Sequence, residues 1–256
     1  MFHVTGAEYD SFMGRFSNGL APLFADFAGV QTGQRVLDVG CGPGALTELL
    51  SRRAGGVAAI DPAEQFVDTC RGRVPGADVR LGSAESLPWR DGEFDAALAQ
   101  LVLTFMADAD RAVSEMARVT RPGGVVAACM WASDEGMQLL HSIRAAAEKL
   151  GKPMHKVAYQ TREEVSALFE RSPLENIEIS ALRPTAAYAD FEDYWTSVLG
   201  APGNVGKYLG TLSDAERGRL GDECFAVVGK PSGAFELGGK AWAARGTAPA
   251  RSGGRA

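Results

Sequence analysis

The sequence contains no closely spaced cysteine pair, no stretch dense in lysine and arginine, and no long apolar run. Its four cysteines lack the spacing of zinc ligands or of a disulfide framework: Cys41, Cys70, Cys129 and Cys224. The formal net charge is −6, and without a basic stretch we do not expect a nucleic-acid partner. No apolar run of about 18 residues and no secretory-type N-terminus is present. These absences predict a cytoplasmic protein with reduced thiols, no membrane span and no metal site.

What is present is the pattern of an α/β domain. With 256 residues, 46% of them hydrophobic, the chain is long enough to bury a substantial core. From about residue 34 to 131, helices alternate with five short apolar strands: "QRVLDVG", "VAAID", "ADVRLGSA", "FDAALAQLVL" and "VVAACMW". This alternation predicts a parallel sheet that is covered by helices on both faces.

The pattern changes after Trp131. Two amphipathic helices are expected, the second opening on a Thr161-x-x-Glu164 capping box, and "ENIEISALR" and "AFELGGKAWAARG" each read as one strand. The N-terminal segment reads as two short helices. We therefore expect an N-terminal helical cap (1–30), one α/β domain (31–246) with a helical insertion (188–230), and a disordered tail (247–256).

A glycine loop follows the first predicted strand, at the sheet edge where ligands bind. The loop, Gly40-Cys41-Gly42-Pro43-Gly44-Ala45, fits the dinucleotide fingerprint G-x-G-x-x-G/A, and Asp61 lies about 20 residues on, as that fingerprint expects. Two neighbouring residues point elsewhere. Asp38 is badly placed beside a pyrophosphate but well placed for a cation, and Pro43 removes an amide donor. Both favour S-adenosylmethionine, which carries an ammonium and a sulfonium and no phosphate.

The motifs and their order resemble those of the class I S-adenosylmethionine-dependent methyltransferases, from about Tyr9 to Gly246. "VLDVGCGPG" is close to the first family motif, and "AAIDPAEQFV", "LGSAESLPWRDGEFDAAL", "LAQLVLTFMAD" and "EMARVTRPGGVV" follow in order. The resemblance implies a Rossmann-like, seven-stranded, mostly parallel sheet of order 3-2-1-4-5-7-6, with the last strand antiparallel and helices on both faces.

The resemblance also implies which residues contact the cofactor. Asp38 and the glycine loop would hold the methionine end, Asp61 the ribose, and the segment 83–85 the adenine. The full set is Asp38, Gly40, Cys41, Gly42, Gly44, Asp61, Pro62, Ser83, Ala84, Glu85, Gln100 and Leu101. Many relatives have aspartate at the Ser83 position, so the adenine contact here would depend on the Ala84 amide and on a side chain that differs from the usual one.

The opening "YDSFMGRFS" resembles the N-terminal cap of the branch related to ubiquinone- and menaquinone-biosynthesis enzymes, methyltransferase type 11. In that branch aromatic and basic cap residues close over the cofactor. The resemblance therefore makes Tyr9, Met13 and Arg15 candidate cofactor contacts.

Methyl transfer from a sulfonium is an in-line displacement that depends mainly on orientation and desolvation, so a general base is not required by the chemistry. No catalytic residue is assigned. Trp131, at the end of the fifth strand, and Trp195, in "FEDYW", are candidate acceptor contacts, with core packing as the alternative for each. His141 is a candidate base, with a helix-surface position as the alternative.

Together these features predict an S-adenosylmethionine-dependent methyltransferase that acts on a small molecule, as a monomer or homodimer, and releases S-adenosylhomocysteine. One alternative is an NAD-dependent oxidoreductase, although no Tyr-x-x-x-Lys pair is present. A second is a catalytically inactive cofactor-binding module. A third, a nucleic-acid methyltransferase, is disfavoured because strand four ends in "AQLV" rather than in N-P-P-Y.

Overall fold

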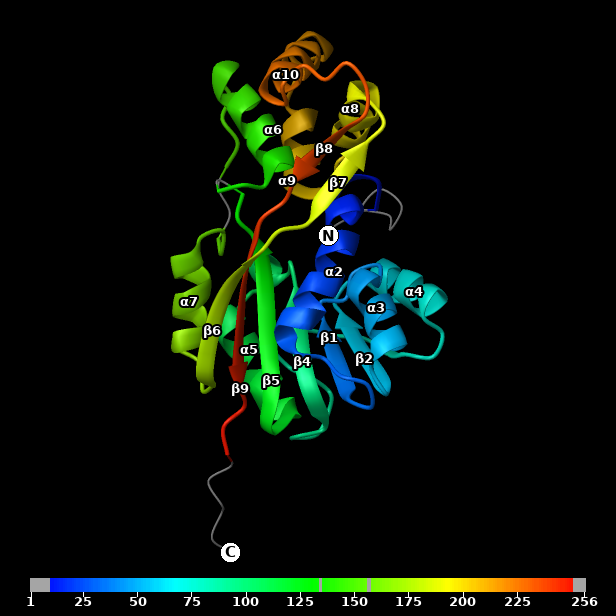
Figure 1. Ribbon diagram of the computed structural model, residues 1–256, viewed down its shortest axis with the longest axis vertical. Coiled ribbons are helices and arrows are strands. Elements are labelled where there is room, and N and C mark those ends of the chain that lie inside the picture. Colours follow the sequence, from blue (N-terminus) through cyan, green and yellow to red (C-terminus); the bar gives the residue numbers. More distant parts are fainter. Residues whose placement is uncertain (1–9, 134, 156–157, 251–256) are drawn as a thin grey trace, which may run out of the picture.

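A seven-stranded sheet forms the centre of the protein (Figure 1). The computed structural model describes residues 10–133, 135–155 and 158–250. The strands are β1 (Arg35–Val39), β2 (Gly56–Asp61), β3 (Asp78–Leu81), β4 (Phe94–Gln100), β5 (Thr120–Trp131), β6 (Glu175–Leu182) and β9 (Ala241–Thr247). Their order is β3-β2-β1-β4-β5-β9-β6; β1 to β5 are parallel, and β9 lies antiparallel between β5 and β6. This confirms the predicted Rossmann-like order, with β9 as the seventh strand.

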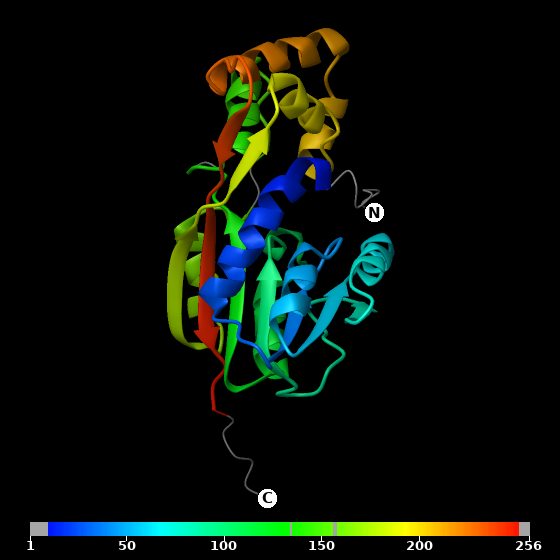
Figure 2. The ribbon, with the colours of Figure 1, turned by 45° about the vertical axis from the view of Figure 1, so that its right-hand side comes forward.

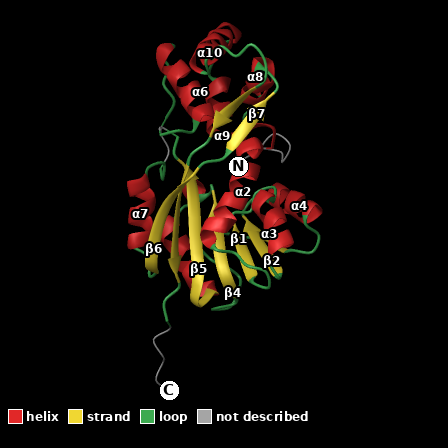
Figure 3. Ribbon diagram, viewed as in Figure 1, coloured by secondary structure: helices red, strands yellow, loops and turns green. Residues whose placement is uncertain are grey.

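Helices cover both faces of the sheet (Figure 3). They include α2 (Arg15–Ala28), α3 (Ala45–Arg53), α4 (Glu64–Arg73), α5 (Ala109–Val119) and α7 (Arg162–Glu170). Successive side chains of a strand point to opposite faces, so Leu98 of β4 packs in the core of α2 and α3 while Ala97 packs in the core of α5 and α7. Because both faces are buried, the central strands are mostly apolar, and acidic and amide side chains occur chiefly near their ends.

The N-terminal segment is one continuous helical run rather than the two short helices expected. A π-helical turn, η1 (Asp10–Gly14), leads directly into α2. The run ends at Gly29, whose φ of 71° and backbone N–H close the last turn onto Ala25 and Asp26. Figure 2 shows α2 extending from the sheet up to the helices above it.

A second layer of structure, the upper lobe, lies above the carboxyl ends of the strands (Figure 1). It consists of α6 (Gln138–Lys149), β7 (Thr185–Tyr188), α8 (Phe191–Leu199), α9 (Gly203–Gly210), α10 (Asp214–Val227) and β8 (Phe235–Gly238). β7 and β8 pair with each other in a separate antiparallel sheet, and α6 packs against α10. No helix in the described ranges is long and apolar enough to cross a membrane.

The prediction of one strand over "AFELGGKAWAARG" is wrong, because the segment divides at Gly239. The Gly239 N–H donates to the Pro184 carbonyl at 2.7 Å, which turns the chain from the upper lobe into the main sheet. A Cβ on Gly239 would lie 3.0 Å from the Phe16 ring, so a side chain would crowd α2 there. The apolar alternation continues across this turn, and only the glycine pair marks it.

Candidate active site

A cavity of about 720 Å³ lies at the carboxyl ends of the central strands, between the sheet and the upper lobe. Its walls come from η1, the glycine loop, the ends of β2, β4 and β5, and from α6 and the start of α9. Thirteen of the predicted site residues line it: Met13, Asp38, Gly40, Cys41, Gly42, Asp61, Pro62, Ser83, Ala84, Glu85, Gln100, Leu101 and Trp131. Residues far apart in the sequence therefore meet at one ligand-sized space.

The glycine loop has a backbone conformation that other residues adopt poorly. Gly40, Gly42 and Gly44 have φ angles of 73°, 53° and 95°. A Cβ on Gly40 would lie 2.7 Å from Cγ1 of Val102, whereas a Cβ on Gly42 would meet no atom within 4 Å. Gly44 does not line the cavity; a Cβ there would lie 2.9 Å from Sγ of Cys70 on α4. Thus Gly40 and Gly44 pack the loop against its neighbours, and Gly42 presents backbone to the cavity.

Asp38 is a buried acid with one unused oxygen. Its residue is 1% exposed, and its Oδ2 accepts a hydrogen bond from the Thr47 hydroxyl at 2.6 Å. Its Oδ1 is buried and has no hydrogen-bond partner within the described ranges. Burial, with a smaller contribution from the negative charge of Asp61, raises its pKa to about 7, and the Thr47 bond opposes this rise. A ligand that donates a hydrogen bond or carries a positive charge would satisfy this carboxylate.

Two more residues that line the cavity, Ser17 and Gln100, carry buried polar atoms without described partners. Gln100 Nε2 donates to the Ser17 carbonyl at 3.2 Å, while Gln100 Oε1 and Ser17 Oγ lack hydrogen-bond partners among the residues that the structure describes. Next to Gln100, Leu101 is buried with a φ of 64°, unusual for a residue with a branched side chain, and its N–H donates to the Cys129 carbonyl at 2.8 Å. Such strain is typical of functional sites.

Asp61 holds the glycine loop in place. Its Oδ2 accepts from the Gly42 N–H and its Oδ1 accepts from the Ala63 N–H, both at 2.9 Å. Burial raises its pKa, and these two hydrogen bonds oppose the rise. Each carboxylate oxygen can accept a second hydrogen bond, so Asp61 retains acceptor capacity for hydroxyl groups of a ligand.

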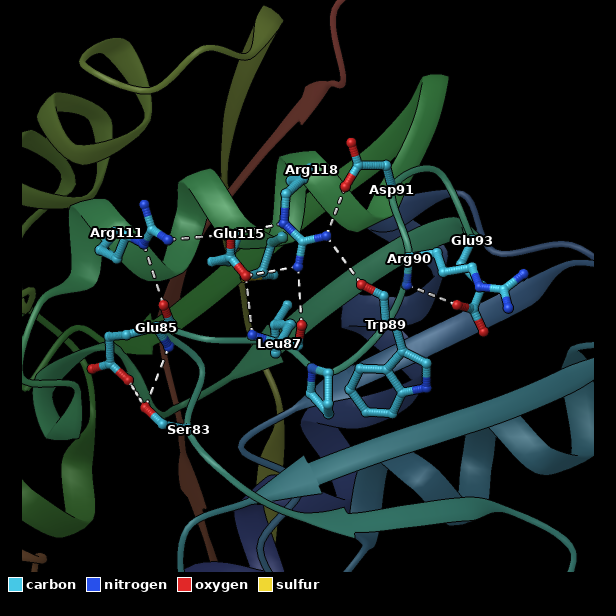
Figure 4. Close-up of polar contacts among 12 residues, drawn as sticks. Ser83, Glu85, Leu87, Trp89, Arg90, Asp91, Glu93, Arg111, Glu115 and Arg118 are labelled. Carbon is cyan, nitrogen blue, oxygen red and sulfur yellow. Dashed lines mark hydrogen bonds and ion pairs between the residues drawn. The ribbon is translucent and has the colours of Figure 1, made fainter.

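The loop after β3 is tied down by a polar network (Figure 4). Glu115 of α5 accepts from the Leu87 N–H at 3.0 Å and from Arg118, and Arg118 donates in turn to the Leu87 and Trp89 carbonyls. At the other end of the loop, Glu85 accepts from the Ser83 hydroxyl and from the backbone N–H groups of residues 107 and 108. The network fixes the part of the cavity wall formed by Ser83 to Glu85.

Replacing Glu115 by alanine is expected to lower the free energy of unfolding by about 2–3 kcal/mol, because it leaves the Leu87 N–H unpaired and Arg118 without its main carboxylate partner. Urea denaturation measures this change. The matched control is Glu223→Ala, which breaks the exposed ion pair with Lys149 and is expected to cost about 1 kcal/mol or less. Equal losses in the two variants would contradict a stabilising role for the network.

Several predicted site residues lie away from the cavity. Arg15 pairs with Asp193 of α8 at 2.5 Å and lies over the Tyr188 ring at 4.8 Å, so it joins the N-terminal helix to the upper lobe instead of covering the cavity. His141 is exposed on α6, and Trp195 packs against Gly221 of α10. Tyr9 lies outside the described residues.

The structure also adds residues that the sequence did not identify. The largest addition is a polar group at the α6–α7 side of the cavity, formed by Arg144, His155 and Gln160. Phe12 and Ser17, from the N-terminal run, also line the cavity. The sequence contains one indication that Arg144 reaches the cavity. Arg144 follows Leu140 by four positions, so the two residues lie on the same face of their helix.

Comparisons with known proteins agree with this architecture. Residues 37–128 match the family model described as a methyltransferase domain. An uncharacterized protein of Mycobacterium tuberculosis is 34% identical over 158 residues, which are 59% of this chain and 57% of that protein, so the chain spans little more than half of this relative.

Two solved structures share the fold. A putative methyltransferase from Bacillus halodurans C-125 has a TM-score of 0.60 at 17% identity, over 90% of this chain and 99% of that one. Geranyl diphosphate C-methyltransferase from Streptomyces coelicolor A3(2), in complex with Mg²⁺, geranyl diphosphate and S-adenosyl-L-homocysteine, has a TM-score of 0.53 at 16% identity, over 89% of this chain and 77% of that one. Residues 37–128 therefore match a methyltransferase domain, and the chain as a whole shares the Rossmann-like fold of these solved structures.

Proposed function

We propose that this protein transfers a methyl group from S-adenosylmethionine to a small-molecule acceptor. The observation that carries the proposal is Asp38, a buried acid that lines the cavity with one oxygen unpartnered among the described residues. Such a carboxylate favours a cationic ligand and would repel a pyrophosphate, which separates this cofactor from NAD. When bound, the cofactor supplies a methyl group on a sulfonium, and the carbon–sulfur bond breaks as the acceptor's lone pair forms the new bond.

The remaining site residues fit the same cofactor. Asp61 has acceptor capacity left for two ribose hydroxyls, and Gly42 leaves open space beside the loop backbone. Ala84, buried beside Ser83 and Glu85, would border the adenine through its backbone. The protein's contribution to the reaction is to orient the two reactants and to exclude water from the cavity, and correct orientation alone supplies roughly 7–11 kcal/mol. No side chain is assigned as a base.

Calorimetry with S-adenosylhomocysteine and with NAD⁺ tests the cofactor. We expect binding of the first and no binding of the second, and the reverse result would refute the proposal in favour of an oxidoreductase. Turnover is tested by incubating the protein with isotope-labelled S-adenosylmethionine and a small-molecule extract. We expect S-adenosylhomocysteine to form only when the extract is present; cofactor binding without transfer would indicate an inactive binding module.

Asp61→Ala is expected to weaken S-adenosylhomocysteine binding by roughly 1.5–3 kcal/mol for each hydrogen bond lost to this carboxylate, and to loosen the glycine loop at Gly42. Calorimetry at constant pH measures the affinity. The control is Asp68→Ala, which removes an exposed carboxylate from the nearby helix α4 and is expected to leave the affinity unchanged. If Asp61→Ala bound the ligand as the native protein does, the proposed ribose contact would be excluded.

A further inference from the structure

The charged side chains that line the cavity are separated by sign. The lining acids that the structure describes are Asp38, Asp61 and Glu85; the first two lie near the carboxyl ends of β1 and β2, and the third lies in the loop after β3. The basic side chains among the described lining residues are Arg144 and His155, which belong to α6 and the segment after it. Among the described lining residues, the acids therefore lie on the strand side of the cavity, and Arg144 and His155 lie on the α6 side.

Most of the other side chains that line the cavity are apolar. Four of the chain's seven methionines line the cavity: Met13, Met106, Met130 and Met154. They come from four different segments, and Trp131, Leu140 and Ile143 are among the other apolar residues of the lining. Methionine side chains are unbranched and polarizable, and they adapt to irregular apolar ligands. An acceptor that fills this space is expected to have a substantial hydrocarbon part.

Arg144 is held in position at the polar end. Its Nη1 donates to Oε1 of Gln160 at 3.1 Å, and Gln160 is itself buried, with its N–H bonded to the Glu164 carboxylate at 2.8 Å. Leu140 and Ile143 share the cavity-facing side of the helix with Arg144. A guanidinium is a planar, permanently charged group whose N–H donors match a carboxylate or a phosphate. In this partly apolar setting its attraction for an anion is stronger than in water.

We infer that the methyl acceptor is an amphipathic anion, with its hydrocarbon part against the methionine-lined wall and a carboxylate or phosphate group bound by Arg144. Gln160 is a positioning residue that orients the guanidinium. This inference rests on the proposed function, because it assigns the half of the cavity that the cofactor does not use.

The test measures binding of three ten-carbon probes to the protein saturated with S-adenosylhomocysteine. The probes are decanoate, decyl phosphate and decanol, which share the chain and differ in the head group. We expect at least one anion to bind roughly tenfold to a hundredfold more tightly than decanol, the effect of hydrogen bonds to a charged group. The tighter of the two anions identifies the head group.

Arg144→Gln is expected to remove the preference for the anion while leaving decanol binding unchanged, and Arg144→Lys is expected to retain part of it. Gln160→Glu is an independent variant that leaves Arg144 in place but gives it a competing carboxylate, and it is expected to remove the preference as well. The matched control is Arg162→Gln, which removes an exposed positive charge at the start of α7 without touching the cavity.

Three results would overturn the inference. The first is equal affinity of the native protein for decanol and both anions. The second is an equal loss of affinity for all three probes in Arg144→Gln, and the third is no binding of any probe. These outcomes differ from failure of the proposed function, in which S-adenosylhomocysteine itself does not bind. In that case the same probes, added to the protein alone, still measure the preference for an anion at Arg144.

Discussion

Replacing Asp38 by asparagine is expected to remove most of the affinity for S-adenosylhomocysteine and, at the same time, to raise the melting temperature of the unliganded protein. Asparagine fills the same space and can still accept the Thr47 hydrogen bond, but it carries no charge. The loss of one partner of a buried charge pair with the ligand costs about 2–5 kcal/mol. The unliganded protein gains stability because it no longer buries a carboxylate whose Oδ1 has no described partner.

Asp38 is also expected to make both the folding stability and the ligand affinity depend on pH. Burial raises the pKa of Asp38 to about 7 in the folded protein, from an ordinary value of 3.8. Between these two values the folded state keeps a proton that the unfolded state has lost, so the contribution of Asp38 to stability falls as pH rises through this window. Ligand affinity changes in the opposite direction, because a cationic ligand requires the ionised carboxylate and therefore binds better above pH 7.

Calorimetry and thermal melts roughly one pH unit below and above that pKa measure both trends. In Asp38→Asn, the change of stability with pH and the change of ligand affinity with pH should both be smaller. Asp68→Asn, which removes an exposed carboxylate, should behave as the native protein does. Native-like affinity in Asp38→Asn, or a melting temperature lower than that of the native protein, would assign Asp38 a structural role instead.

Most of the sheet and the cavity residues at the strand ends could be predicted because both depend on local sequence. Asp38, Gly40 and Asp61 each stand at or just after the end of an apolar strand, and parallel strands bring such positions to one edge. The alternation of strands and helices specifies the layers, since any other arrangement would expose apolar faces.

The position of Arg15 and the polar side of the cavity at Arg144 and Gln160 could not be predicted, because both depend on contacts between distant segments. Arg15 and Asp193 pair across 178 positions, and nothing in "YDSFMGRFS" distinguishes that partner from a ligand. Arg144 and Gln160 meet only after α6 has packed on the upper lobe and α7 on the main sheet. Similarly, His141 and Arg144 are neighbours on one helix, and only the packing decides which of them reaches the cavity.

Gly40→Ala is expected to lower the free energy of unfolding by about 2–5 kcal/mol. The substitution requires a left-handed backbone, with φ at 73°, which costs an ordinary residue about 1–2 kcal/mol. The new Cβ would also lie 2.7 Å from Cγ1 of Val102 and 2.9 Å from its Cβ and Cγ2. Valine has little rotamer freedom with which to move aside, and overpacking of this kind typically costs 1–3 kcal/mol more. Urea denaturation measures the total.

Gly42→Ala separates these two costs because it shares the left-handed backbone, at φ 53°, but meets no atom within 4 Å. We expect the free energy of unfolding of this variant to fall only by the cost of the left-handed backbone. We also expect it to bind S-adenosylhomocysteine more weakly, because its methyl group enters the cavity. Adding Val102→Ala to Gly40→Ala should restore part of the lost stability, and a double-mutant cycle measures this coupling. If the two glycine variants lost equal stability and Val102→Ala restored none, the close approach of Val102 would not be the reason that this position requires glycine.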